Sequence, residues 1–273
     1  QYTVGSVIAP LPNREIDVVT NMRAALHDGE GTMLVTEIEK PKAESLGALI
    51  RVRAAGVCGS DLLNYSLNVT PETSAGGHEV AGDIVEVGTG VDSNMVGQRV
   101  AMEIAGLGRA CLDCWFCRIG QYRQCLHIGP MGNGGFAEYI SRPAAACFPM
   151  PDSLSWEEGA LVEPLAVSVH ALRRGQLTGG ETVAVLGSGN IGLTAVAAAR
   201  AMGAGKIFVT ARHQHQGGMA KRLGADWVFS PEEIGFKERL MDATDGRGAD
   251  LTIETVGGRS DTTLKLALEV TRM

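Results

Sequence analysis

Four cysteines stand close together near the middle of the chain, at the spacing Cys111-x2-Cys114-x2-Cys117-x7-Cys125. Thiolates at such intervals let one loop wrap a tetrahedral metal ion, with each sulfur about 2.3 Å from a zinc. An iron–sulfur cluster fits less well, because the last interval is seven residues and no proline follows Cys125. The spacing therefore predicts a closed, structural zinc site, with buried or partly vacant thiols as the alternative.

A glycine-rich segment lies between an apolar run and an alanine-rich helical stretch. It consists of Gly187, Ser188, Gly189, Asn190, Ile191 and Gly192. Glycines in this pattern permit a tight turn, close approach of a pyrophosphate, and close packing of helix on strand, while the helix N-terminus attracts the phosphates. The pattern alone is weak, but its place after a strand favours dinucleotide binding over a purely structural turn.

The residue expected to read the adenosine ribose lies about 20 residues further on, at the end of the next strand. NAD sites usually have Asp or Glu there, whereas this chain has Ala211 followed by Arg212. The carboxylate that would repel a 2′-phosphate is missing here, and the guanidinium of Arg212 could bond such a phosphate. We therefore expect NADP rather than NAD. The alternative is a surface arginine beside a site that lacks its acid.

A second set of possible metal ligands is scattered along the chain: Cys58, His78, Glu79 and Glu163. Spacing alone does not join them, because a lone cysteine, histidine or acid is more often structural. Ser60 has the same ambiguity, since its hydroxyl could cap a turn.

Several motifs nevertheless occur together in one order. They are GVCGSD at 56–61, GGHEVAG at 76–82, the four-cysteine loop, GGFAEY at 134–139, EPLA at 163–166 and the glycine-rich segment. With this combination, residues 23–273 resemble the zinc-containing medium-chain dehydrogenases of the alcohol dehydrogenase superfamily. The resemblance implies a catalytic zinc held by Cys58 and His78, with Glu79 or Glu163 as the third protein ligand. An acid rather than a cysteine at 163 is similar to the polyol, threonine and sugar dehydrogenase branch.

The resemblance also implies a reaction. A zinc with an open coordination position would lower the pKa of a bound alcohol, whose carbon then gives a hydride to the nicotinamide. Ser60 is expected to bond the substrate oxygen and pass its proton outward. Many members of the family place a histidine three residues later to end this relay, but this chain has Leu63. The proton would then leave through the cofactor ribose and water, or by another exit.

The elements that must position these residues suggest an α/β protein of two domains. Short apolar runs broken by turn residues predict a β-rich, GroES-like catalytic domain over residues 22–166. The predicted strands are Met33 to Ile38, Ala48 to Ala54, Val80 to Val87 and Gln98 to Glu103. A helix is expected from Trp156 to Leu172, with Ser155 as its N-cap.

From Gly180 onward, strand and helix patterns alternate, which predicts a Rossmann domain with a doubly wound parallel sheet over residues 167–273. Such a sheet normally continues beyond a segment like the last residues here, so we expect this domain to be incomplete at its C-terminal end. Residues 1–21 precede the usual family start and are expected to be an N-terminal extension.

Bulk composition excludes several classes of function. The chain has 273 residues, a formal net charge of -7 and 20% charged residues, so it offers no broad positive field for nucleic acid or anionic lipid. No apolar run reaches the roughly 18 residues that cross a bilayer. Without a visible signal peptide, the expected location is cytoplasmic, where six cysteines are ligands or core residues rather than disulfides.

The expected protein is thus an oxidoreductase with two zinc ions per chain. It would transfer a hydride between NADP and a secondary alcohol of the polyol, sugar or amino-alcohol type. The family also implies a homodimer or homotetramer. Two alternatives remain: a zinc-free quinone or enoyl reductase of the same fold, and a non-catalytic member that binds NADP.

Overall fold

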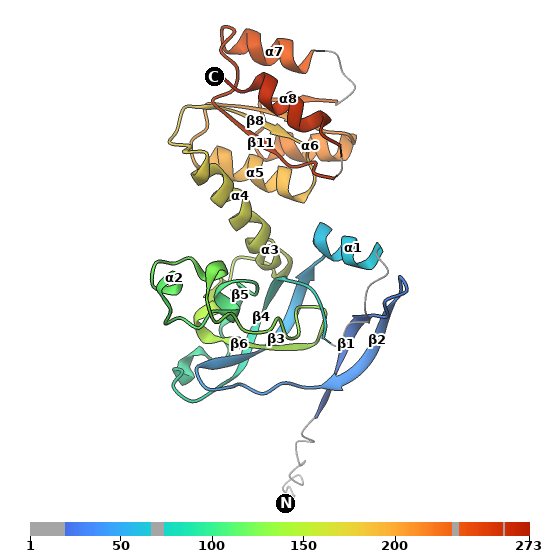
Figure 1. Ribbon diagram of the computed structural model, residues 1–273, viewed down its shortest axis with the longest axis vertical. Coiled ribbons are helices and arrows are strands. Elements are labelled where there is room, and N and C mark those ends of the chain that lie inside the picture. Colours follow the sequence, from blue (N-terminus) through green and yellow to red (C-terminus); the bar gives the residue numbers. More distant parts are fainter. Residues whose placement is uncertain (1–19, 67–73, 231–234, 259) are drawn as a thin grey trace, which may run out of the picture.

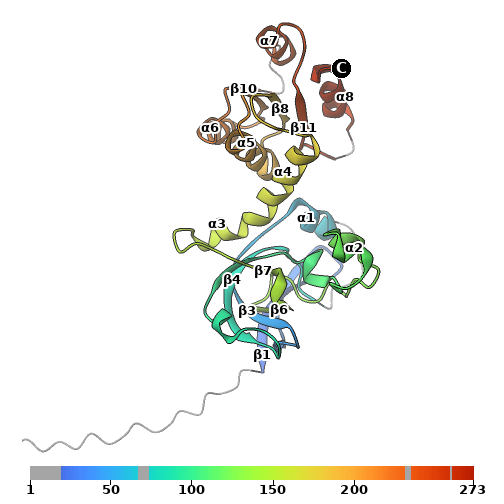
Figure 2. The same ribbon diagram turned by 90° about the vertical axis from the view of Figure 1, so that its left-hand side faces the viewer.

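The computed structural model describes residues 20–66, 74–230, 235–258 and 260–273. Figure 1 shows two bodies of secondary structure, a β-rich body formed by the earlier residues and an α/β body formed by the later ones. Two consecutive helices run from one body to the other. The views in Figures 1 and 2 agree that these helices are the link between the bodies.

The β-rich body is built on a five-stranded antiparallel sheet with the order β6-β3-β4-β5-β7. Its strands are β3 (Gly47–Gly56), β4 (Glu79–Val87), β5 (Arg99–Met102), β6 (Tyr139–Pro143) and β7 (Cys147–Pro149). A separate antiparallel hairpin consists of β1 (Asn21–His27) and β2 (Met33–Glu39). All four strands predicted in this region are present. Alternate residues of the central strands, such as Ile50 and Ile84, are fully buried in the sheet's core.

Two helices of this body carry residues of interest. Helix α1 (Gly59–Ser66) directly follows β3, and the single-turn helix α2 (Trp115–Arg118) lies within the cysteine loop. The sequence patterns did not indicate α1. Its position matters because α1 starts directly after Cys58, and the end of β3 just before it pairs with the start of β4 (Figure 1).

The link between the bodies consists of α3 (Trp156–Ala160) and α4 (Val162–Arg174). Ser155 caps α3 as predicted, in a capping box with Glu158. The sequence pattern predicted one helix, but the structure breaks it at Leu161. Pro164 explains the break, because it has no N–H to donate to the carbonyl of Ala160 four residues earlier.

The α/β body has a four-stranded parallel sheet with the order β10-β9-β8-β11. Its strands are β8 (Thr182–Leu186), β9 (Lys206–Thr210), β10 (Trp227–Phe229) and β11 (Leu251–Glu254). Its helices are α5 (Asn190–Ala201), α6 (Gln214–Arg222), α7 (Phe236–Ala243) and α8 (Thr262–Val270). The alternation of strands and helices predicted after Gly180 is present.

Helices cover both faces of this parallel sheet. Buried side chains of α4, α5 and α6 pack on one face, and those of α7 and α8 pack on the other. The sheet is therefore doubly wound, and its strand order reverses between β8 and β11. Ligands of such sheets bind at the carboxyl ends of the strands beside this reversal. Within the described ranges, no helix has both the length and the apolarity needed to span a membrane.

The capping box at the start of α3 leads to a stability prediction. Ser155 Oγ accepts the N–H of Glu158 at 3.1 Å, and the Glu158 carboxylate accepts the N–H of Ser155 at 2.7 Å. We expect Ser155→Ala to lower the free energy of unfolding by about 1 kcal/mol, measured by urea denaturation. Exposed Ser153 makes no such cap, so Ser153→Ala should leave stability nearly unchanged. An equal loss in both variants would contradict the cap's role.

Candidate active site

The four-cysteine loop folds into a compact cluster of sulfurs. The Sγ atoms of Cys111 and Cys117 lie 4.0 Å apart, those of Cys114 and Cys117 3.5 Å, and those of Cys114 and Cys125 3.9 Å. Four sulfurs placed about 2.3 Å from one tetrahedral ion would lie about 3.8 Å apart. The sulfur positions therefore fit a zinc ion, and all four lie within 4.8 Å of one another.

Backbone N–H groups around the cluster point at its sulfurs. Those of Cys111 and His127 donate to Cys125 Sγ at 3.3 and 3.4 Å, and that of Cys114 donates to Cys111 Sγ at 3.3 Å. The backbone N–H of Cys117 is the main reason that the pKa of the Cys114 thiol falls to about 6. Burial raises the pKa of Cys117 to about 12. Such N–H donors stabilise the thiolates that bind a metal, and a cation would remove the burial penalty.

A second cluster brings together three residues that are separated in sequence. Cys58 lies between β3 and α1, His78 immediately precedes β4, and Glu79 is the first residue of β4. One potential ligand atom from each lies within 4.8 Å of the others. A thiolate, an imidazole and a carboxylate form a ligand set that suits zinc, with a coordination position left open for a substrate.

The buried carboxylate of Glu79 depends on the glycine opposite it. Gly56 pairs with Glu79 across β3 and β4, and a Cβ atom at Gly56 would lie 2.0 Å from Glu79 Oε2. Only glycine leaves room for this carboxylate. Glu79 is 3% exposed, and its pKa is raised, chiefly by burial, while nearby His78 opposes the rise. A negative charge on Glu79 is thus unfavourable without a partner, and a bound cation would stabilise it.

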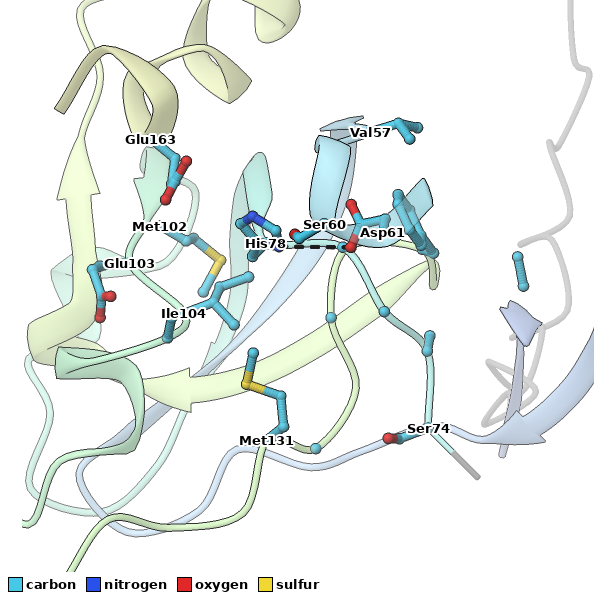
Figure 3. Close-up of a pocket in the computed structure, with 18 of the residues that line it drawn as sticks. Val57, Ser60, Asp61, Ser74, His78, Met102, Glu103, Ile104, Met131 and Glu163 are labelled. Atoms are coloured by element: carbon cyan, nitrogen blue, oxygen red, sulfur yellow. Dashed lines mark ion pairs between the residues drawn. The ribbon is translucent and has the colours of Figure 1, made fainter. Parts of the chain in front are cut away.

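Asp61 belongs to this site, although the sequence patterns assigned it no role. Its Oδ2 accepts the backbone N–H of Cys58 at 2.9 Å, and its Oδ1 lies 3.8 Å from His78 Nδ1. Figure 3 shows Asp61 and Ser60 beside His78. An Asp three residues after Cys58 could have signalled this local bond, since Asp commonly bonds the backbone at a helix start. A carboxylate behind a ligating histidine orients its ring.

Glu163 lies in the first turn of α4, outside the group of three. It faces the same cavity, and its pKa is raised chiefly by burial, with His78 lowering it and Glu79 raising it further. The charges of these three residues therefore interact. Among the described residues, the compact three-atom group contains Glu79 and not Glu163.

His78, Asp61 and Glu163 line a cavity of about 1830 Å³, and Cys58 and Glu79 lie behind His78 without lining it. Its polar lining includes Ser60, His78 and Glu163. Its apolar lining includes Met102, Ile104, Met131, Phe136 and Phe148. Figure 3 shows Met102, Glu103 and Ile104 apart from Ser60 and Asp61, with His78 between them. Leu63 lies in α1, but the structure does not describe its side chain.

The glycine-rich segment has the geometry of a ligand-binding turn. Gly187 directly follows β8 with a φ of 102°, and its N–H donates to Thr210 Oγ1 at the end of β9. A Cβ atom at Gly192 would lie 2.2 Å from the Gly187 carbonyl oxygen. A Cβ atom at Gly189 would meet nothing within 4 Å. One glycine therefore serves packing, while another borders open space at the N-terminus of α5.

Ser188, Asn190 and Ile191 complete this turn. Ser188 is 2% exposed, and its Oγ has no hydrogen-bond partner among the described residues. Asn190 is the first residue of α5, whose free N–H groups face the same space. The segment can thus offer several unused donors to an anionic group.

A hollow of about 470 Å³ lies beyond the end of β9. Ala211, Arg212 and His213 line it together with residues of α6. Ala211 is buried at the position where NAD sites usually have an acid, whereas Arg212 is exposed. The hollow can therefore receive the ribose end of a dinucleotide.

Comparisons with known proteins match both bodies. Residues 45–152 match the model of the alcohol dehydrogenase GroES-like domain, and residues 190–273 match that of the zinc-binding dehydrogenases. Sorbitol dehydrogenase of Bacillus subtilis (strain 168) is 38% identical over 249 residues, which cover 88% of this chain and 70% of that protein. The chain belongs to the zinc-containing medium-chain dehydrogenases. The predicted fold class, a GroES-like domain followed by a Rossmann domain, is confirmed.

A second relative of this medium-chain dehydrogenase supports its place within the family. L-Threonine 3-dehydrogenase of Pyrococcus horikoshii is 36% identical over 237 residues, covering 84% of this chain and 67% of that protein. The expected polyol and threonine dehydrogenase-like branch is therefore confirmed. Members of this branch are oxidoreductases that act on CH–OH groups.

Two similar solved structures carry different nicotinamide cofactors. The rspB dehydrogenase of E. coli, complexed with NADH, superposes with a TM-score of 0.79 at 30% identity, covering 92% of this chain and 74% of that one. A zinc-binding dehydrogenase of Sinorhizobium meliloti bound to NADP has a TM-score of 0.80 at 30% identity, with the same coverages. Family membership thus supports a nicotinamide cofactor without deciding between the two.

The contrast between two glycines gives a prediction for this turn. We expect Gly192→Ala to lower the free energy of unfolding by several kcal/mol, at least about 2, because the methyl group meets backbone. Gly189→Ala should cost only about 1 kcal/mol of stability, because Ala is a poorer N-cap of α5 than Gly, but weaken nicotinamide-dinucleotide binding at least about tenfold, because its methyl group would fill the space for the pyrophosphate. Thermal unfolding and calorimetric titration measure the two effects. Unchanged dinucleotide affinity in Gly189→Ala would contradict this placement.

Proposed function

We propose that this medium-chain dehydrogenase oxidises a secondary alcohol of the polyol, sugar or amino-alcohol type, or reduces the matching ketone, with zinc and NADP. The observation that carries the proposal is the convergence of Cys58, His78 and Glu79 within 4.8 Å beside a large cavity. Ser60 borders the same cavity. A metal-binding group and a proton-transferring hydroxyl therefore face one space that can hold a small molecule.

The two clusters support two zinc ions with different roles. The sulfurs of Cys111, Cys114, Cys117 and Cys125 would enclose one ion completely, as in structural sites. Cys58, His78 and Glu79 would hold the other and leave a position open. Glu79 is the better third ligand because its carboxylate lies in the compact group. Glu163 would instead lie next to that position.

Zinc bound in the open site supplies Lewis-acid polarisation of the substrate oxygen. Ser60 would donate and accept hydrogen bonds at that oxygen and carry its proton away from the reacting carbon. Asp61 would hold Cys58 and the ring of His78 in place. Leu63 cannot accept the proton from Ser60, so the proton would leave through the cofactor ribose and water or by another exit.

The same observations weigh against the two alternatives. A zinc-free quinone or enoyl reductase would have no need for the group of three ligands or for the four-sulfur cluster. A non-catalytic NADP-binding member would not need an open cavity beside the three ligands. Both features favour a zinc-dependent enzyme.

The preference for NADP rests on Ala211 and Arg212 at the hollow after β9. The buried methyl of Ala211 contributes no charge, and the exposed Arg212 guanidinium can bond a 2′-phosphate. His213 lines the same hollow. Two further expectations, a homodimer or homotetramer and a cytoplasmic location, stay predictions.

Metal analysis tests the two zinc sites. Plasma mass spectrometry of the purified protein should give two zinc ions per chain, and Cys58→Ser should give one. Oxidation of the alcohol should fall at least about 100-fold in this variant, because Lewis-acid stabilisation is lost. Buried Cys147 belongs to neither cluster, so Cys147→Ala should keep both ions. Two zinc ions in Cys58→Ser would show that Cys58 is not a ligand.

Cofactor titration tests Arg212. Arg212→Ala should weaken NADP binding about 10- to 100-fold, because a charge-assisted hydrogen bond to the 2′-phosphate is lost, and should leave NAD binding unchanged. Arg222 is the last residue of α6 and does not line the hollow, so Arg222→Ala is the matched control. Calorimetry with each cofactor measures both effects. Equal losses for NADP and NAD would refute a phosphate contact.

A further inference from the structure

Arg123 brings a positive charge to the cavity from the cysteine loop. It lines the cavity although it lies two residues before Cys125, at the edge of the four-sulfur cluster. Its Nη1 donates to the carbonyl oxygen of Ala105 at 3.0 Å, which directs the side chain toward the cavity wall. Its aliphatic stem lies over Gly106, where a Cβ atom would be 3.2 Å from Arg123 Cδ. One hydrogen bond therefore ties this exposed guanidinium to that wall.

This guanidinium has no anionic partner in the described part of the chain. Arg123 takes part in none of the ion pairs found there. The nearest candidate is Glu103, but its two oxygens accept the N–H groups of Gly106 and Gly108 at 2.7 and 2.9 Å. Arg123 is exposed, so most of the five N–H donors of its guanidinium are free to bond a ligand in the cavity.

The distribution of charge in the cavity is uneven. Among the described lining residues, Arg123 is the sole arginine or lysine. Asp61, Glu103 and Glu163 are the acids of this lining, and Figure 3 shows Asp61 on the other side of His78 from Ile104, the residue before Ala105. Apolar Met131 and Ile104 form part of the wall. An anion bonded to Arg123 would therefore meet the cationic side chain of this wall, where the carboxylate of Glu103 is already engaged by the N–H groups of Gly106 and Gly108.

We propose that Arg123 selects substrates with an oxyanion, a carboxylate or a phosphate, at the end remote from the hydroxyl that is oxidised. This inference deepens the proposed function and rests on it. A planar guanidinium with free donors matches two oxygens of such a group in a bidentate contact. Neutral polyols would occupy the same cavity without this contact.

The test compares one neutral and two anionic ligands of the same carbon chain: sorbitol, D-gluconate and sorbitol 6-phosphate. The wild type and Arg123→Gln are titrated by calorimetry without nicotinamide cofactor, so that no turnover occurs. Steady-state kcat/KM is then measured for each ligand with cofactor. Arg123→Gln should lose about 10- to 100-fold in affinity and kcat/KM for at least one anion and change less than about threefold for sorbitol. The anion that loses more identifies carboxylate or phosphate as the preferred group.

Arg118→Gln is the matched control. Arg118 lies on the same loop, pairs with Asp113 at 2.8 Å and does not line the cavity, so its removal changes the net charge equally. Its affinities for the anions should be unchanged, and both variants should keep the wild-type zinc content. An Arg123→Gln variant that loses affinity equally for all three ligands, or for none, would overturn the selectivity proposal. Anion selectivity in calorimetry without turnover of any alcohol would instead contradict the proposed function and leave the Arg123 contact standing.

Discussion

The buried carboxylate of Glu79 is the constraint on which the site depends. An acid removed from water costs free energy unless a cation or hydrogen bonds compensate, and burial raises the pKa of this one. Its position is set by the antiparallel register of β3 and β4, which places it over Gly56. The same register brings the end of β3, and with it Cys58, close to His78. The sheet is thus arranged to concentrate ligand atoms where a cation relieves the cost.

Helix α4 connects this site to the α/β body. Its first turn carries Glu163 toward the cavity, whereas further along Ser168 Oγ lies 2.8 Å from Thr194 Oγ1 of α5. Leu172, near its end, is fully buried in the core beneath the parallel sheet. One rigid element therefore contacts both the cavity and the helix that begins at the glycine-rich turn. Its start is defined by Pro164, which separates it from α3.

The cysteine loop has a structural consequence beyond its sulfurs. Its backbone is folded tightly around the cluster, with N–H groups turned inward to Cys111 and Cys125. Side chains of the loop are consequently displayed outward, and Arg123 reaches the cavity. A metal in this loop would fix the position of a cavity residue without taking part in the reaction. The stability of the loop and the recognition of substrate are in this way linked through one segment.

The sequence by itself determined the parts whose geometry is local. The glycine-rich turn, the four-cysteine loop and the cap at Ser155 each form within a few neighbouring residues, so residue type and spacing were sufficient. The alternation of strands and helices after Gly180 likewise indicated the doubly wound sheet. Pro164 was visible too, but the apolar pattern around it masked the break between α3 and α4. Membership of the family followed from the order of the motifs.

Tertiary structure decided what depends on contacts between distant segments. Cys58 and the pair His78 and Glu79 meet only because β3 and β4 lie antiparallel in one register, and spacing could not reveal this. The sequence left Glu79 and Glu163 as equal candidates, whereas in the described part of the structure Glu79 belongs to the compact group with Cys58 and His78 and Glu163 does not. The place of Arg123 at the cavity and the approach of Asp61 to His78 also emerged only from packing. Local motifs encode their own geometry, but a cavity is formed by side chains that only the completed fold brings together.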